Sequence, residues 1–203
     1  LWENLVARSH DFWVFFYPEF RKAFPEHLAN VSLEEFYRAV NKVEPSFIRT
    51  EADEATYNLH IMLRYEMEKD MLNGTIEVGD IPEAWNRKSQ DYLGITPEND
   101  AQGVLQDIHW SMGEFGYFPT YALGNLIAAQ IWARAEQELP SLGESIRKGD
   151  LSSLLGFLRR DLHVYGAKFT PEETLRLSTG SDRIDPDCFI GLLEKKYSAI
   201  YGF

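Results

Sequence analysis

The sequence has few of the features that would indicate a disulfide scaffold, a membrane anchor or a nucleic-acid surface. It holds one cysteine in 203 residues, Cys188, so neither an internal disulfide nor a zinc site with several cysteines can form. No apolar run reaches the roughly 18–20 residues that cross a bilayer. Acidic residues outnumber basic ones by 32 to 20, and the net charge of −12 disfavours nucleic acid and anionic lipid. We therefore expect no nucleic-acid partner, no membrane and, from the lone cysteine, a cytoplasmic protein.

Helical periodicity dominates what the sequence does have. Apolar residues recur at helical spacing along most of the chain, which predicts an all-α fold. Pro18 interrupts the first of these segments. The expected helices are residues 1–17, 33–43, 53–73, 83–92, 121–139, 141–148 and 152–165, one opened by Thr170, and a last one from 186 to about 201. We see no repeat or linker, so we expect a single helical unit over residues 1–203. The one candidate for β-structure is a short hairpin at 75–78.

Capping residues mark several of the expected helix ends. Ser32 is followed by Glu35, and Thr170 by Glu173, at the spacing of a capping box. Gly74 suits a left-handed helix terminator.

Residues 94–110 break the helical pattern. The turn-forming residues of this segment are Gly94, Pro97, Asn99, Asp100 and Gly103. Loops of this length are uncommon inside compact domains and are often functional. We therefore expect a long, ordered loop here.

Arg49 precedes a possible helix start, in which Thr50 is the cap and Asp53 the third residue. A helix N-terminus attracts anions, and a guanidinium can hold a carboxylate through two parallel hydrogen bonds. Arg49 is therefore a candidate receptor for the C-terminus of a peptide. The alternative is a surface ion pair with Glu51 or Asp53.

The segment from Gln106 to Trp110 places an amide, an acid, an imidazole and an indole together at the end of the loop. The imidazole of His109 can donate to a developing oxyanion or shuttle a proton, and Asp107 or Gln106 can fix its orientation. The alternative is a buried histidine held by ordinary hydrogen bonds.

Tyr117 and Tyr121 follow closely, and a tyrosine hydroxyl can also stabilise an oxyanion. The alternative is aromatic packing in the core.

The remaining ionisable residues give weaker signals. None of the five histidines stands at a recognised metal-ligand spacing from another. We interpret His60, Arg64, Glu66, Glu68 and Asp70 as residues on a helix surface with partners four positions away.

Two motifs together resemble signatures of the thermostable metallocarboxypeptidases, the carboxypeptidase Taq family. The motif Ile-Arg-x-x-Ala-Asp is matched by Ile48, Arg49, Ala52 and Asp53. The motif Gly-x-x-Gln-Asp-x-His-Trp is matched by Gly103, Gln106, Asp107, His109 and Trp110. The resemblance covers essentially the whole chain and indicates the C-terminal part of such an enzyme.

This resemblance implies a helical, zincin-type subdomain beside a deep groove, a homodimer, and a zinc or cobalt ion in the full-length enzyme. In the family, two histidines of His-Glu-x-x-His and a later Glu hold the metal, and the Glu of that motif serves as general base. The sequence has no His-Glu-x-x-His. We therefore expect the metal-binding half to precede residue 1, no metal to be bound by this chain, and no activity of this chain alone.

The resemblance also implies residue roles in hydrolysis of the last peptide bond of a peptide. Arg49 would bind the terminal carboxylate, and His109 with Tyr117 or Tyr121 would stabilise the tetrahedral intermediate; we favour Tyr117. The substrate-binding residues would be Arg49, Asp53, Gln106, Asp107 and Trp110.

Two alternatives to an enzyme part stay open. A non-catalytic helical module could bind peptide C-termini through Arg49, or bind a partner helix. A structural unit could instead associate through the apolar face of residues 1–17.

Overall fold

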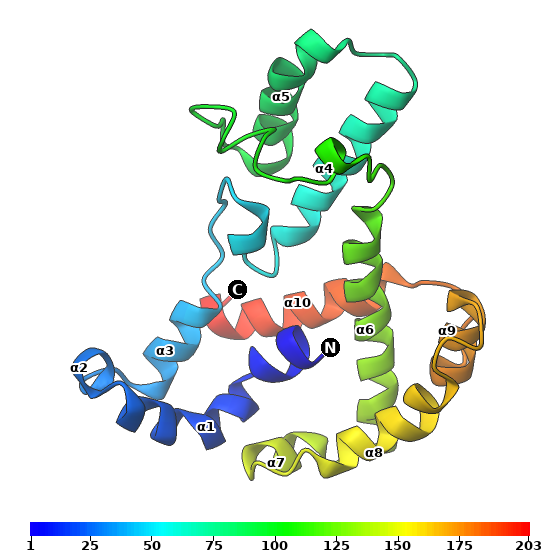
Figure 1. The fold of residues 1–203 in the computed structure, drawn as a ribbon. Coiled ribbons are helices and arrows are strands. Elements are labelled where there is room, and N and C mark those ends of the chain that lie inside the picture. Colours follow the sequence, from blue (N-terminus) through cyan, green and yellow to red (C-terminus); the bar gives the residue numbers. More distant parts are fainter. The chain divides into compact units, whose positions relative to one another are not determined.

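The computed structural model describes residues 1–203 and consists of helices without a strand (Figure 1). The all-α prediction is confirmed. Contacts between Cα atoms divide the chain into two compact units. Unit 1 comprises residues 1–41 and 124–203, and unit 2 comprises residues 42–123. That the whole chain forms one helical unit stays a prediction.

None of the helices combines the length and apolar character that a bilayer span requires.

Unit 1 packs short helices around an apolar core. Its elements are η1 (a π-helix, Trp2–Ala7), α1 (His10–Ala23), α2 (Pro25–Leu28), α3 (Leu33–Val40), α6 (Pro119–Glu138, which begins in unit 2), α7 (Leu142–Arg147), α8 (Ser152–Asp161), η5 (a 3₁₀ turn, His163–Tyr165), α9 (Pro171–Thr179) and α10 (Pro186–Tyr201). The core side chains include Val6, Trp132, Ile146 and Phe157, from η1, α6, α7 and α8. Burial of their apolar surface stabilises the unit by ~25 cal/mol per Å².

The first helix, predicted over residues 1–17, is interrupted after Ala7 and ends later than expected, at Ala23. The chain is π-helical only to Ala7, and Ser9 then caps a new helix by accepting from the backbone N–H of Phe12 at 3.2 Å. That helix, α1, continues through Pro18 to Ala23 instead of stopping. Pro18 is exposed, so no packed neighbour opposes its ring.

Both predicted capping boxes are present. Ser32 accepts from the N–H of Glu35 and Glu35 accepts from the N–H of Ser32, and Thr170 and Glu173 do the same at the start of α9. Helix α3 ends at Val40, three residues earlier than expected. The side chain of Asn41 donates to the carbonyl of Tyr37 at 3.0 Å and takes the place of a further turn.

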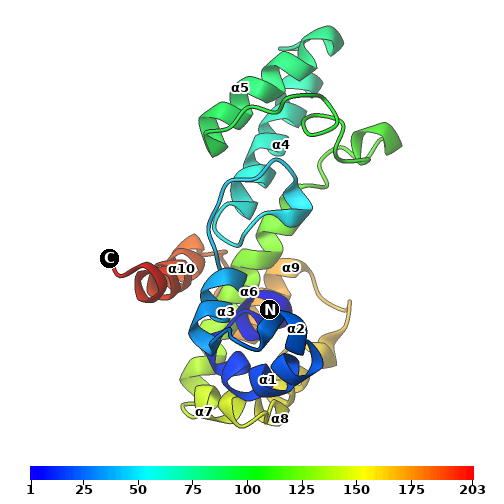
Figure 2. The ribbon, with the colours of Figure 1, turned by 90° about the vertical axis from the view of Figure 1, so that its left-hand side faces the viewer.

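Unit 2 is built on a pair of helices, α4 (Tyr57–Leu72) and α5 (Ile81–Leu93), which lie side by side in Figures 1 and 2. Three 3₁₀ turns complete it: η2 (Arg49–Glu51), η3 (Val78–Asp80) and η4 (Trp110–Met112). The buried core side chains are Leu63, Met67, Ala84 and Trp85.

The possible β-hairpin at 75–78 does not form. Thr75 gives both its backbone N–H and its hydroxyl to the carbonyl of Asp70, at 2.9 and 3.1 Å. The chain is thereby turned back onto the end of α4, and Val78 opens the turn η3. Gly74 has the left-handed φ of +66° that the sequence predicts for a terminator.

The predicted long loop over 94–110 is present. Ser89 anchors its start by donating to the carbonyl of Ile95 at 2.8 Å. Gly103 packs within the loop, where a Cβ would lie in contact, at 3.4 Å, with Pro97, Asn99 and Trp85. The loop of unit 2 is therefore held against the helical pair by contacts with α5.

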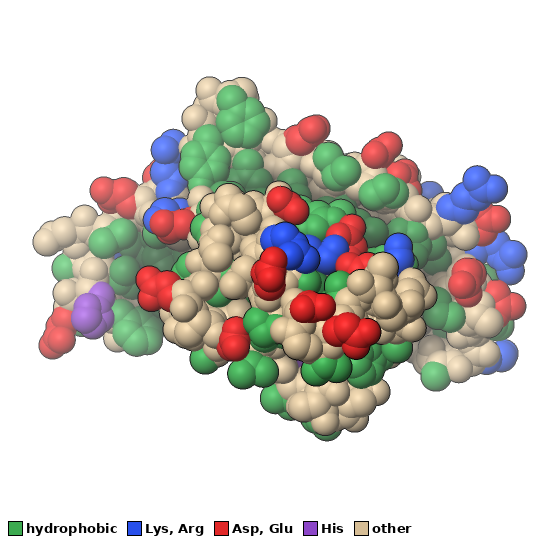
Figure 3. All heavy atoms as spheres, turned by 90° about the horizontal axis from the view of Figure 1, so that it is seen from above, with side chains coloured by type: hydrophobic (Ala, Val, Ile, Leu, Met, Phe, Trp, Pro, Cys, Tyr) green, Lys and Arg blue, Asp and Glu red, His purple; other side chains and the backbone are tan.

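The molecular surface does not gather its negative charge in one place on the face that Figure 3 shows. Acidic side chains are scattered there between basic ones, and apolar side chains reach the surface among them. The loop itself exposes the large apolar side chains of Leu105 and Ile108, and Met112 of η4 is exposed after it.

Candidate functional site

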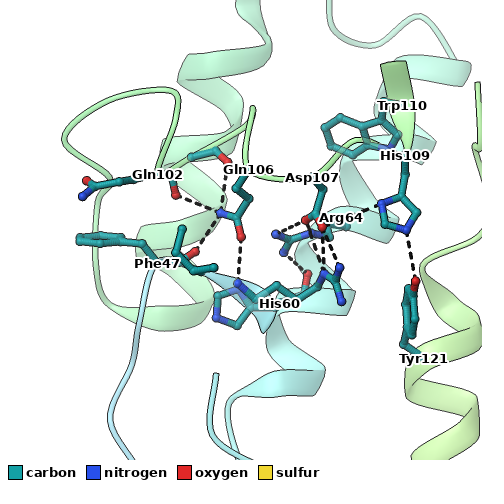
Figure 4. A network of polar contacts seen from close by, with 12 residues as sticks. Phe47, His60, Arg64, Gln102, Gln106, Asp107, His109, Trp110 and Tyr121 are labelled. Atoms are coloured by element: carbon teal, nitrogen blue, oxygen red, sulfur yellow. Dashed lines mark hydrogen bonds and ion pairs between the residues drawn. The ribbon is translucent and has the colours of Figure 1, made fainter. Parts of the chain in front are cut away.

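The carboxylate of Asp107 lies between two buried guanidinium groups (Figure 4). Arg49 donates to it from Nη2 at 2.7 Å and from Nε at 3.2 and 3.4 Å. Arg64 donates from Nε at 2.7 Å. Nη2 of Arg64 is also 2.7 Å from Oδ2 of Asp107 but makes no hydrogen bond, so that contact is an ion pair only. Two cations share one anion, which leaves one positive charge in excess.

The charge states of the three groups follow from burial and from each other. Burial alone would raise the pKa of Asp107, but hydrogen bonds and charge from Arg49 and Arg64 outweigh it and hold that pKa below its usual range. Burial lowers the pKa of Arg64 to about 10, despite Asp107. All three groups are therefore ionised at neutral pH, and the excess positive charge persists.

Aromatic rings cover the two guanidinium groups. The Cζ atom of Arg49 lies 4.9 Å from the ring centre of Tyr121, and that of Arg64 lies 4.8 Å from that of Trp85. Phe118 is within 5.6 Å of both Cζ atoms. Attraction between cation and ring offsets part of the cost of removing these groups from water.

His109 connects this charge cluster to the tyrosines. Its Nε2 lies 3.2 Å from the hydroxyl of Tyr121, and its Nδ1 lies 3.8 Å from Oδ1 of Asp107. The ring centre of Tyr117 is 5.7 Å from that of His109, and Tyr117 is 47% exposed. Burial raises the pKa of Tyr121, so its hydroxyl keeps its proton at neutral pH. His109 thus lies between Asp107 and Tyr121 and is hydrogen-bonded to the tyrosine hydroxyl but not to the carboxylate.

The prediction that a helix starts at Thr50 is wrong. The N-terminus of a helix therefore does not lie beside Arg49, which stands in the 3₁₀ turn η2. Asp53 instead stabilises the turn that precedes α4, because its Oδ1 accepts from the N–H groups of Ala55 and Thr56 at 2.8 and 2.9 Å. Helix α4 begins only at Tyr57. Arg49 is 6% exposed and faces Asp107, so it forms no surface pair with Glu51 or Asp53.

Gln106 ties the two sequence motifs together. Its Oε1 accepts from the backbone N–H of Arg49 at 2.8 Å, and its Nε2 donates to the carbonyls of Phe47, Gln102 and Gly103. The amide is therefore fully engaged within the chain.

The interpretation of α4 as carrying only surface ionisable residues is wrong for three of them. His60, Arg64 and Glu68 are buried, at 1%, 0% and 2% exposure. Their spacing of four residues places them on one face of α4, but this spacing does not show whether that face is covered. Glu66 and Asp70 do lie nearer the surface, each beside Lys88.

The buried His60 lies beside the charge cluster. Arg64 donates from Nη1 to its backbone carbonyl at 2.8 Å. Burial, together with the charges of Arg64 and Arg49, lowers the pKa of His60 to about 4. This imidazole is therefore neutral at physiological pH.

The residues around Asp107 do not form a set of metal ligands. The structure brings together no group of three or more His, Cys, Asp and Glu side chains that could hold a metal ion. The site built around Asp107 consequently does not fit a metal by itself.

Comparison with known proteins identifies the relatives of this chain. Residues 1–197 match the family model of the carboxypeptidase Taq (M32) metallopeptidases. Thermostable carboxypeptidase 1 of Thermus thermophilus is 48% identical over 99% of this chain, and carboxypeptidase 1 of Bacillus subtilis is 42% identical over 98%. The chain belongs to the carboxypeptidase Taq family, as its two motifs indicated.

A solved structure extends the likeness to the fold. The M32 carboxypeptidase of Deinococcus radiodurans superimposes with a TM-score of 0.96 and 42% identity, over 100% of this chain and 41% of that one. The chain spans about 40% of the length of the curated relatives, 39% for the Thermus protein and 40% for the Bacillus protein.

Proposed function

We propose that this chain is the substrate-recognition part of a metal-dependent carboxypeptidase that removes the last residue of peptides. The observation that carries the proposal is the pair of buried guanidinium groups sharing the single carboxylate of Asp107, next to His109. Membership of the family supports the class of reaction.

The excess positive charge suits the terminal carboxylate of a peptide. A guanidinium has five N–H donors. Arg49 commits the one on Nε and one on Nη2 to Asp107, and one on Nη1 to the hydroxyl of Tyr57 at 3.2 Å. Two N–H groups remain for a substrate. A bound carboxylate would balance the charges of the cluster, whereas an internal peptide bond would not, and this difference makes the enzyme an exopeptidase.

In this proposal His109 and Tyr121 act on the peptide carbonyl, and their contact at 3.2 Å supports that role. As its carbon becomes tetrahedral, the carbonyl oxygen gains negative charge, and a donor already aimed at it lowers the barrier. Tyr121 is favoured over Tyr117 because its hydroxyl is the one within 3.2 Å of the imidazole. In this proposal Asp53, Gln106 and Trp110 also hold the site in shape, which their internal hydrogen bonds support. Direct contact of those three with substrate stays a prediction.

The metal of the full-length enzyme, zinc or cobalt, belongs in this proposal to residues outside the chain. The chain covers about 40% of its relatives' length, so most of such a protein is not represented here. A metal would supply an activated water, while the residues of this chain bind and orient the peptide. We further propose that the full-length protein is cytoplasmic and forms a homodimer, as the family resemblance implies.

The test is release of the C-terminal amino acid from an N-blocked dipeptide by the full-length protein with added zinc or cobalt. The same dipeptide with a C-terminal amide is the matched substrate, because it lacks only the carboxylate. The proposal expects cleavage of the acid, loss of cleavage with the amide, and a raised KM for the acid in Arg49→Lys. The 203-residue chain is expected to be inert.

Two results would contradict the proposal. Equal cleavage of acid and amide would remove the role of the positive charge. Binding of peptide acids without any cleavage by the full-length protein would favour a non-catalytic module that uses the same site.

A further inference from the structure

Glu68 lies outside both sequence motifs but contacts the second of them at Trp110. It lies on α4, is 2% exposed, and directs both oxygens at the segment that follows His109. Oε1 accepts from the indole Nε1 of Trp110 at 2.9 Å, and Oε2 accepts from the backbone N–H of Gly116 at 3.0 Å. One carboxyl group therefore holds both ends of residues 110–116.

The held segment is a closed turn. The N–H of Glu114 donates to the carbonyl of His109 at 2.9 Å, and that of Gly113 donates to the carbonyl of Trp110 at 3.1 Å. Gly113 and Gly116 have φ of +77° and +82°, values that favour glycine. The turn is closed by its own hydrogen bonds, so we expect contacts at its two ends to fix its orientation.

The two ends are the neighbours of the candidate reacting residues. Trp110 follows His109, and Gly116 precedes Tyr117. On the other side of His109, Asp107 is held by Arg64, one turn before Glu68 on the same face of α4. His109 is thus held between two contacts that come from a single helix.

We propose that Glu68 is a positioning residue, which fixes the 110–116 turn and through it the place of His109 against the substrate. The inference rests on the proposed carboxypeptidase function. A buried carboxyl group is costly to retain unless its oxygens are hydrogen-bonded, and here both are used on this turn. Small displacements of a catalytic group cost up to about 100-fold in rate, so the loss of this clamp should appear in kcat.

The test compares Glu68→Gln with Glu66→Gln in the full-length protein. Glutamine at 68 keeps one oxygen for Trp110 but turns an amide N–H₂ toward the N–H of Gly116. Glu66 is the matched control, since it lies on the same helix and accepts from Lys88 and Tyr92 at 2.8 and 2.7 Å without touching the turn. Trp110→Phe is a second variant, which loses the indole bond and leaves the bond to Gly116.

Two measurements are made on each variant. Steady-state kinetics on the blocked dipeptide should show kcat lowered about 10- to 100-fold in Glu68→Gln with KM changed less than about twofold. Hydrogen exchange of the Gly116 amide should become about tenfold faster or more. Trp110→Phe should lower kcat by a smaller factor, and Glu66→Gln should change neither quantity.

Unchanged exchange at Gly116, or a kcat equal to that of Glu66→Gln, would overturn the proposal. An inert wild-type enzyme would instead count against the proposed function. The exchange measurement would then still decide whether Glu68 holds the turn, so the two failures are distinguishable.

Discussion

Arg64 donates from Nε to Oδ2 of Asp107 over 2.7 Å, across 43 positions of sequence. The guanidinium is fully buried, and its partner is the only carboxylate that the two arginines of the site share. This contact determines the charge of the site and also ties the long loop to α4. It therefore links the stability of unit 2 to its proposed function.

Asp107→Asn should lower the free energy of unfolding by about 3–5 kcal/mol, because it leaves two buried guanidinium groups without a counter-charge. Asp11→Asn is the control. Asp11 pairs with Arg147 at 2.6 Å, but the side chain of Arg147 is 57% exposed, and such pairs contribute about 0–1 kcal/mol. Urea unfolding of the 203-residue chain measures both. Similar losses in the two variants would mean that Asp107 does not neutralise buried charge.

Stability should also depend on pH through His60. The folded-state pKa is about 4 and the ordinary value is 6.5, so the unfolded chain binds more protons between these pH values. The contribution of His60 to stability is therefore fully present above about pH 6.5 and is lost as the pH falls toward 4. A pKa difference of about 2.5 corresponds to about 3 kcal/mol.

Urea unfolding at pH 7 and pH 5 measures this dependence. His60→Gln should reduce the difference in unfolding free energy between the two pH values, since glutamine does not titrate. His163→Gln is the control, because His163 is exposed. If wild type and His60→Gln showed the same difference, folding would not lower the pKa of His60.

The two tyrosines can be separated by removing one hydroxyl at a time from the full-length enzyme. Tyr121→Phe should lower kcat about 100-fold, because it removes the hydroxyl within 3.2 Å of Nε2 of His109. Tyr117→Phe should cost less than about tenfold, since Tyr117 contacts His109 by its ring. A larger effect at Tyr117 would reverse the assignment and restore the preference drawn from the sequence.

Pro18→Ala should raise the free energy of unfolding by about 1–3 kcal/mol. A proline inside a helix cannot donate to the carbonyl four residues earlier, here that of Val14, and Pro18 is exposed, so no core contact is lost. Pro25→Ala is the control. Pro25 stands at the start of α2, where proline is favourable, so its removal should lower stability by about 0.4–1 kcal/mol. Thermal unfolding that ranks the two variants in the opposite order would contradict this.

Sequence-based predictions are confirmed at helix ends whose structure depends on a few adjacent residues. The capping boxes at Ser32 and Thr170 and the terminator Gly74 formed as expected, because their hydrogen bonds or backbone angles involve residues within one turn. The same reasoning failed at Thr50, where Asp53 offered the better acceptor, and at Pro18, where α1 continued.

Residues on α4 show why the buried polar contacts of the site could not be predicted from local patterns. His60, Arg64 and Glu68 look like ordinary polar residues of a surface helix, and their burial depends on a loop more than 40 positions away. No local pattern states which face of a helix that loop will cover.

From the sequence we predict the helical class, the capping boxes at Ser32 and Thr170 and, through the motifs around Arg49 and His109, the family. Those features depend on local hydrogen bonding and on residue identity. The packing of distant segments sets Asp107 between Arg49 and Arg64, brings Tyr121 to His109, and directs Glu68 to the turn after it. Buried charges and donors must find partners wherever the packed chain supplies them, so the identity of those partners is a property of the fold and not of a local segment.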